Sequence, residues 1–254
     1  MRRLCLFLVS AVLFLSFFNV RAAENEYHFY LKRARDHASP TTDERFLALF
    51  DRDAFFLDTE AAKKQEKRIY LTFDAGYENG NVSKILDILK KEDVQGSFFV
   101  LAHLIKSEGA LLSRMKEEGH LICNHTARHK NMAHFSDEEF RKELLALEKI
   151  YEEETGEALA HFYRPPEGSF SASNLACAKR IGYKTVFWSL AYADWNDKVA
   201  PTDEKAIQLL KDNTHPGAIV LLHPTSAINA RILGDMIRYW KGEGYSFHTL
   251  DEIV

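Results

Sequence analysis

Short apolar runs alternate with helix-length segments over residues 68–254. The first run, 68–73, is rich in β-branched and aromatic residues, and the segment after it repeats apolar residues at the i, i+3, i+4, i+7 spacing of one helix face. Glycines close several of the connections before the next apolar run. The pattern predicts further strands at 97–101, 119–123, 161–163, 182–188, 218–222 and 244–247. Strands separated by helix-length segments indicate parallel βα units.

Two helix starts are marked by capping residues. Asn81 precedes the apolar stripe of the first helix, and we expect it to cap that helix. Ser136 and Glu139 have the spacing of a capping box and precede a second apolar stripe. Residues 23–67, in contrast, are polar and only weakly periodic, so we expect a lead-in that packs on the outside of the domain formed by 68–254.

Residues 1–22 have the pattern of a secretory signal. Arg2 and Arg3 precede an apolar run over 4–18, and small residues follow at Val20 and Ala22. A membrane-spanning helix needs about 20 apolar residues, so an uncleaved anchor is the weaker alternative. The mature chain is therefore expected to begin near residue 23, to be secreted or held in the cell envelope, and to have no stable insertion in the membrane.

Polar residues follow the predicted strands at their carboxyl ends. Parallel strands present these ends on one face, which is where (β/α) barrels build their active sites. An open doubly wound sheet would also fit the strand lengths, but no Gly-rich GxGxxG turn follows the first strand. We therefore predict a distorted (β/α) barrel. The residues expected to converge are Asp74, His103, Asn124, His125, Arg164, the 193–195 loop and His223.

Composition narrows the class of protein. With 46% hydrophobic residues among 254, the chain can bury a full core, which excludes a disordered protein. Its formal charge is −4, and it becomes −7 once the three arginines of residues 1–22 are removed. An acidic chain is a poor general binder of nucleic acid. Three cysteines do not make a disulfide scaffold, and whether Cys123 and Cys177 pair stays open.

Two histidines are candidates for a metal site. His125 and His129 are four residues apart, so on a helical turn both imidazoles would share a face and reach one cation. Two histidines at this spacing are more often ordinary surface residues. Here, however, the pair directly follows a predicted strand, at the end where a barrel builds its site, and this position favours a divalent metal.

The other strand-end residues suggest acid–base chemistry. Asp74 is a candidate general base, and Arg164, in a rigid Arg-Pro-Pro turn, is a candidate to pair with it and orient it. His223 could act as a general acid for a leaving amine, with Asp194 holding its imidazole. Trp195 has two interpretations, a core residue or a wall on which a sugar stacks.

Five motifs in this order resemble the polysaccharide deacetylase family, carbohydrate esterase family 4 with a NodB-homology domain, over residues 69–254. Within that family the chain looks most like the spore-cortex enzymes that deacetylate N-acetylmuramic acid before muramic δ-lactam forms. The motifs are Thr72-Phe-Asp-Ala-Gly76, His125-Thr-Ala-Arg-His129, Arg164-Pro-Pro-Glu-Gly168, Asp194-Trp195 and Leu221-Leu-His223. The resemblance implies a peptidoglycan substrate, a divalent cation (zinc or similar) on the two histidines, and loss of acetate from an N-acetyl sugar.

The chain also departs from the family pattern. Ala75 stands where the family usually has an acidic metal ligand, so the resemblance implies a sparse site of two histidines, water and Asp74. Glu167 stands where a basic residue is common, and Lys130 replaces the usual partner after the second histidine.

Three residues are expected to contact the substrate. They are Tyr77, whose neighbouring backbone N–H would stabilise the oxyanion, Trp195, and Arg128. Arg128 or Lys130 is also the expected cation for the lactyl carboxylate of muramic acid.

Two alternatives remain. The first is a deacetylase of N-acetylglucosamine in peptidoglycan or chitin, or an esterase of acetylated xylan. The second is a non-catalytic carbohydrate-binding relative, which Ala75 prompts. A base and an acid retained together in Asp74 and His223 weigh against the second, because a binding module needs neither.

Overall fold

The computed structural model describes residues 25–196 and 198–253. The strands in this part of the chain are β1 (Tyr27–His28), β2 (Ala54–Phe55), β3 (Arg68–Ala75), β4 (Ser97–Val100), β5 (Leu121–Asn124), β6 (Ala160–Tyr163), β7 (Ser169–Phe170), β8 (Lys184–Val186), β9 (Ala218–Leu222) and β10 (Ser246–His248). The helices are α1 (Glu44–Leu47), α2 (Thr59–Lys64), α3 (Asn81–Lys91), α4 (Ala102–Ser107), α5 (Gly109–Glu117), α6 (Asp137–Thr155), α7 (Ala172–Arg180), α8 (Asp203–Asp212) and α9 (Ala227–Gly242). Short 3₁₀ turns lie at Pro166–Gly168 and Leu250–Glu252.

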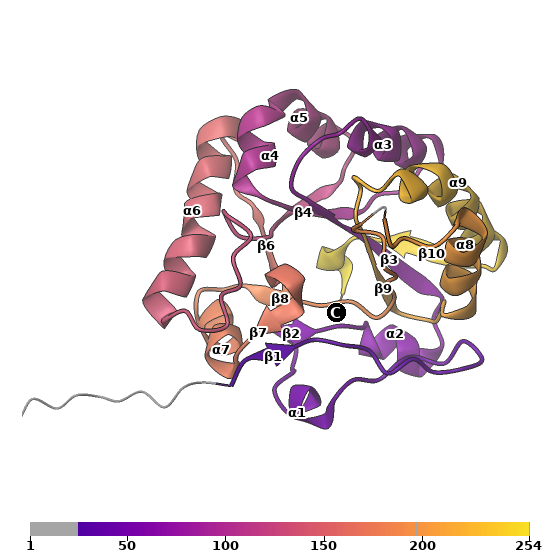
Figure 1. Ribbon diagram of the computed structural model, residues 1–254, viewed down its shortest axis with the longest axis horizontal. Coiled ribbons are helices and arrows are strands. Elements are labelled where there is room, and N and C mark those ends of the chain that lie inside the picture. Colours follow the sequence, from indigo (N-terminus) through magenta and orange to yellow (C-terminus); the bar gives the residue numbers. More distant parts are fainter. Residues whose placement is uncertain (1–24, 197, 254) are drawn as a thin grey trace, which may run out of the picture.

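The main sheet is parallel and curls around its own interior. Its strands follow the order β10-β3-β4-β5-β6-β8-β2, and β9 pairs with β3 beside this path. A bridge between Leu190 and Val220 joins β9 to the segment after β8. Figure 1 shows helices α3 to α9 as an outer ring around the strands, with β1, α1, β2 and α2 along the lower edge. The predicted distorted barrel is confirmed.

Side-chain alternation along β3 separates two apolar layers. Ile69, Leu71 and Phe73 pack in one cluster with the predicted stripe of α3 and with residues of α9. Tyr70, the residue between the first two, belongs to a second cluster that collects one or more side chains from β2, β4, β5, β6, β8 and β9. This second cluster fills the barrel interior, as the two-residue period of a strand requires. Asp74, the second-last residue of β3, is on the same face of the strand as Tyr70 and therefore lies at the end of that interior.

The lead-in is more closely integrated than the sequence suggested. Its strand β2 pairs in parallel with β8 in the main sheet, so the expectation that this segment only packs on the outside is wrong. An aromatic cluster with members Phe29, Phe46 and Phe56 attaches it to Phe170 and Phe187. Two-residue strands have too few positions to show alternation, which is why the sequence did not reveal β1, β2 or β7.

One predicted helix cap is confirmed and the other is wrong. Ser136 and Glu139 form the expected capping box at the start of α6. Asn81, by contrast, is the first residue of α3, and Gly80 occupies the cap position in a left-handed conformation (φ 88°). The Asn81 side chain instead donates to the Thr225 carbonyl at 2.9 Å, tying α3 to the loop after β9.

Other sequence expectations concern the cysteines and the N-terminus. Cys123 and Cys177 are both buried and free, so they do not pair. The expected signal at 1–22 lies outside the described residues. Within 25–196 and 198–253, no helix has the length and apolar character needed to cross a membrane.

Candidate active site

A cleft of about 880 Å³ opens at the carboxyl ends of the parallel strands. It brings together Asp74 at the carboxyl end of β3, His125 directly after β5 and His223 directly after β9, as their positions at the carboxyl ends of predicted strands indicated. His129 and Trp195 also line it. The remaining walls come from the lead-in, the turn that begins at Arg164, the 188–193 segment and β9. They are Phe29, Arg33, Pro165, Glu167, Gly168, Trp188, Ala191, Tyr192, Ala193 and Leu221.

Arg164 holds the carboxylate of Asp74 in place. Its Nη1 donates to Asp74 Oδ1 at 2.8 Å, and its Nη2 donates to Thr72 Oγ1 at 2.9 Å. Arg164 is fully buried, and its guanidinium lies 4.1 Å from the centre of the Phe99 ring. Burial of Asp74 opposes its ionised form, but the charges of Arg164, His125 and His223, together with the hydrogen bond from Arg164, outweigh burial and lower the pKa of the carboxyl group. Asp74 is therefore an ionised, oriented proton acceptor.

The two histidines come together on a loop. The expectation that they share a helical turn is wrong, because residues 125–130 have no helical structure. Thr126 and His129 have positive φ values of 71° and 54°, and the Thr126 hydroxyl accepts from the His129 N–H at 2.9 Å. This tight turn brings the His125 and His129 ring centres to 4.9 Å from each other. The predicted pair therefore exists, held by side-chain hydrogen bonds of the loop.

His125 has one nitrogen occupied and one facing the base. Its Nδ1 donates to the Arg164 carbonyl at 2.9 Å, which leaves Nε2 at 3.6 Å from Asp74 Oδ2. Burial lowers the pKa of His125 to about 4, so the ring is neutral near pH 7. A neutral imidazole whose second nitrogen is held by a carbonyl is the usual form of a metal-ligating histidine.

The donor set fits a sparse metal site. Within the described residues there is no group of three or more His, Cys, Asp or Glu side chains assembled to hold a metal. Ala75 is fully buried in the apolar cluster with α3 and α9 and offers no donor. His125 and His129 nevertheless present imidazoles next to Asp74, and water would have to complete their coordination of a cation.

His223 is held by the carboxylate of Asp194 and by the side-chain amide of Asn229. The His223 Nδ1 donates to Asp194 Oδ1, and the His223 backbone N–H donates to Asp194 Oδ2, both at 2.7 Å. Asn229 donates to the same carboxylate and to the His223 carbonyl, while the Tyr192 hydroxyl donates to Asn229. Burial opposes the charged form of His223, but the hydrogen bond to Asp194 and its charge raise the pKa of the imidazole above the usual value. This favours the protonated state that a general acid requires.

The three expected substrate contacts have different positions. Trp195 is 66% exposed and lines the cleft with its ring centre 6.2 Å from that of His223, so it is a wall residue and not core. Tyr77 is also exposed but does not line the cleft. Arg128 lies outside the cleft lining, and its guanidinium pairs with the buried carboxylate of Glu143. Lys130 does not line the cleft either, so neither of these two residues supplies a free cation to it.

The sequence did not reveal several residues that complete the site. Asn229 and Tyr192, which support Asp194, have no motif of their own. Arg33 and Phe29 line the cleft from the lead-in, a segment in which the sequence predicted no strand whose carboxyl end could have pointed to them. The close pairing of the lead-in with the main domain is the only signal that could have found them, and it needs the structure.

Comparison with known proteins defines the family. The sequence model of the polysaccharide deacetylase family matches residues 61–186. A peptidoglycan-N-acetylmuramic acid deacetylase of Bacillus subtilis, PdaA, is 39% identical over 224 residues, covering 88% of this chain and 84% of the relative. The solved structure of Bacillus subtilis PdaA, a family 4 carbohydrate esterase, has a TM-score of 0.83 and 39% identity, covering 90% of this chain and 96% of its own.

A family 4 carbohydrate esterase from Bacillus anthracis gives a TM-score of 0.73 at 36% identity, with the same coverage of both chains. The chain belongs to the polysaccharide deacetylase family. It is accordingly a hydrolase of carbon–nitrogen bonds other than peptide bonds. Deacetylases of this family are generally metal-dependent, which agrees with the donor set of His125 and His129.

Proposed function

We propose that this protein removes the acetyl group from N-acetylmuramic acid in peptidoglycan and leaves the free amine from which muramic δ-lactam forms. The observation that carries the proposal is the arrangement of a fixed base and a fixed acid in one cleft, Asp74 on Arg164 and His223 on Asp194. The likeness to PdaA over most of both chains supports the choice of sugar.

The residues divide the hydrolysis between them. Asp74 accepts a proton from the water whose oxygen adds to the acetyl carbonyl carbon, and Arg164 keeps the carboxylate in place throughout. When the carbon–nitrogen bond breaks, protonated His223 gives its proton to the departing amine, and acetate is the second product. Each such proton transfer contributes about 10²–10⁴-fold to the rate. Trp195 offers an exposed ring at the cleft wall on which a sugar can stack.

A divalent cation held by His125 and His129 would supply Lewis-acid polarisation of the acetyl carbonyl. The Arg164 carbonyl would keep the His125 ring in its ligating orientation. Because peptidoglycan lies outside the cytoplasmic membrane, this function requires export, in agreement with the signal expected at residues 1–22.

The test compares two substrates of equal length. Purified protein is incubated with peptide-free glycan strands of peptidoglycan and with chitin oligomers, and the deacetylated sugars are identified by mass, with Asp74→Asn as the inactive control. We expect faster deacetylation of muramic acid in the glycan strands. A clear preference for the chitin oligomers would favour a deacetylase of N-acetylglucosamine. Binding without turnover of either substrate would favour a carbohydrate-binding relative.

A further inference from the structure

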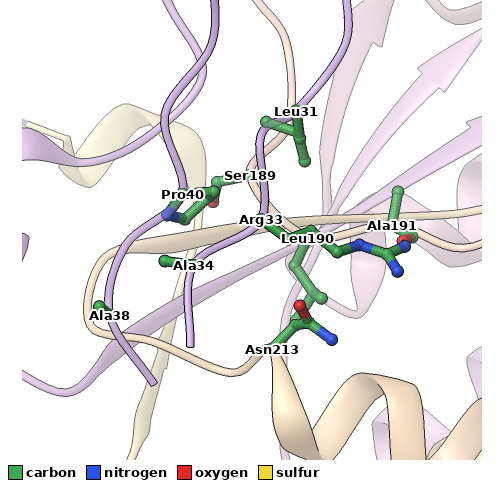
Figure 2. A pocket seen from close by; sticks show the side chains of 9 residues that line it. All are labelled: Leu31, Arg33, Ala34, Ala38, Pro40, Ser189, Leu190, Ala191 and Asn213. Carbon is green, nitrogen blue, oxygen red and sulfur yellow. The ribbon is translucent and has the colours of Figure 1, made fainter. Parts of the chain in front are cut away.

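Arg33 carries a positive charge from the lead-in into the active-site cleft. Its Nη2 donates to the Ala191 carbonyl at 3.2 Å, and the residue lines the cleft together with Asp74 and His223. Figure 2 shows the Arg33 side chain extending past Leu190 toward Ala191. The guanidinium is exposed, and a single hydrogen bond to a neutral carbonyl leaves most of its donors free.

The backbone around Arg33 is fixed on both sides. Lys32 and Thr41 exchange two backbone hydrogen bonds of 2.7 and 3.1 Å, which close the loop 32–41. On the loop itself, His37 Nδ1 lies 3.0 Å from the Thr214 carbonyl. Before it, Phe29 packs on Phe187 with ring centres 4.6 Å apart. Arg33 is therefore presented from a closed, anchored loop, and its position relative to the barrel is set by the fold.

Within the described residues, no other lysine or arginine is available in the cleft. Arg33 is the one lysine or arginine among the cleft-lining residues, and no carboxylate in this part of the chain pairs with it. Arg164 is buried against Asp74, and Arg128 is engaged by Glu143. The carboxylates of Asp74 and Glu167 line the same cleft. Arg33 offsets part of this negative charge for an anionic substrate.

Arg33 and the general acid His223 are both hydrogen-bonded to the same short segment, residues 191–194. Ala191, which holds the guanidinium, is three residues from Asp194, which holds His223, so their Cα atoms are at most about 11 Å apart. In muramic acid the lactyl ether and the acetamido group occupy neighbouring ring carbons, so the lactyl carboxylate lies close to the amine that leaves. A guanidinium matches a carboxylate in both charge and fork geometry.

We propose that Arg33 binds the free carboxylate of the lactyl group and so selects N-acetylmuramic acid over N-acetylglucosamine. This inference rests on the proposed function and adds a specificity-determining residue to it. It also replaces Arg128 and Lys130, the cations that the sequence suggested for this carboxylate. Where a stem peptide is attached, the lactyl group ends in an amide, and Arg33 has no charge to pair with.

The experiment uses two versions of one substrate, peptide-free glycan strands with the lactyl carboxylates free or converted to primary amides. Arg33→Met removes the charge and keeps an apolar stem, and Arg33→Lys keeps the charge. Arg35→Met is the matched control, because Arg35 is exposed on the same loop but does not line the cleft. Values of kcat and KM are measured for each pair, with thermal melts to verify folding.

We expect Arg33→Met to lower kcat/KM for the carboxylate substrate about tenfold, mainly through KM, and to change it less than twofold for the amide. Arg33→Lys should restore part of the loss, and Arg35→Met should behave like the wild type. Equal effects on both substrates, or a wild-type enzyme that does not distinguish them, would overturn the role of Arg33 while leaving muramic acid deacetylation in place. A wild-type enzyme that acts on chitin oligomers alone would overturn both proposals.

Discussion

At the scale of single residues, the site assigns opposite protonation states to two neighbouring groups. Arg164 lowers the pKa of Asp74, and Asp194 raises the pKa of His223. A base needs the ionised carboxylate and an acid needs the charged imidazole, so each partner supports the form that the chemistry uses. Groups whose environments move their pKa values apart in this way are typical of acid and base pairs in enzymes.

Asp194→Asn should shift the pH dependence of the enzyme. The mutation removes the main charge that raises the pKa of His223, so the lowering by burial is opposed only by the weaker effect of Asp74. Protonated His223 is then lost at a lower pH, and we expect the alkaline limb of the kcat/KM profile to move down by about one pH unit or more. A profile of kcat/KM against pH for both proteins measures this shift.

The same interaction affects stability with a defined sign. Because the pKa of folded His223 is raised, the Asp194–His223 pair stabilises the fold below the unfolded value of about 6.5. That contribution disappears as the pH rises through the folded pKa, so the difference in melting temperature between wild type and Asp194→Asn should be larger at pH 6 than at pH 9. An unchanged alkaline limb in the variant would count against His223 as the acid.

The sequence predicted the site residues at the carboxyl ends of the strands. It did not predict those that the lead-in contributes to the cleft. Asp74 lies at the carboxyl end of a strand of clear apolar pattern, and His125, Arg164 and His223 each directly follow one, so the parallel sheet alone brings them together. Arg33 reaches the cleft from a segment more than 30 residues before β3. Its position depends on how the lead-in docks, and no local pattern contains that information.

At the scale of elements, the docking of the lead-in depends on a close backbone approach at Gly217. This glycine precedes β9 with φ 74°, and its carbonyl accepts from the Asp58 N–H at 3.0 Å. A Cβ at this position would lie 2.4 Å from the Asp58 carbonyl oxygen. Asp58 caps α2 and accepts from the Tyr70 hydroxyl at 2.6 Å, so the contact joins the lead-in to β3 as well.

Gly217→Ala should therefore destabilise the protein, by about 1–3 kcal/mol from backbone strain and more if the contact is lost. Gly242→Ala is the matched control, because Gly242 ends helix α9 with nothing within 4 Å of an added Cβ, and alanine there should be neutral or stabilising. Chemical denaturation of both variants gives the free energies of unfolding. Equal stability of Gly217→Ala and wild type would show that the lead-in docks without this contact.

At the scale of the whole molecule, the barrel positions the candidate ligands through protein contacts. The Arg164 carbonyl holds His125, and the Thr126 hydroxyl holds the backbone of His129. Both contacts belong to a fold whose core clusters extend through the sheet and the outer helices. The fold should therefore persist without a metal, in contrast to small domains whose core is built around one.

Removal of metal should abolish turnover and leave the protein folded. Chelated protein is expected to keep its far-ultraviolet circular dichroism and a cooperative melt, because the fold does not depend on the cation. Addition of Zn²⁺ at a hundred times its Kd should then stabilise the folded state by about 2.7 kcal/mol, since only that state presents both imidazoles together. A thermal melt with and without Zn²⁺ measures this without reference to activity.

His129→Ala should eliminate the Zn²⁺-dependent rise in melting temperature, because it leaves one imidazole beside Asp74. His103→Ala is the matched control, since His103 is an exposed histidine of α4 that follows a strand of the same sheet but does not line the cleft. We expect the control to keep the full rise and the full activity. If Zn²⁺ stabilises His129→Ala as much as the wild type, the cation binds elsewhere. If thoroughly chelated wild type retains its turnover, Asp74 and His223 act without a cation.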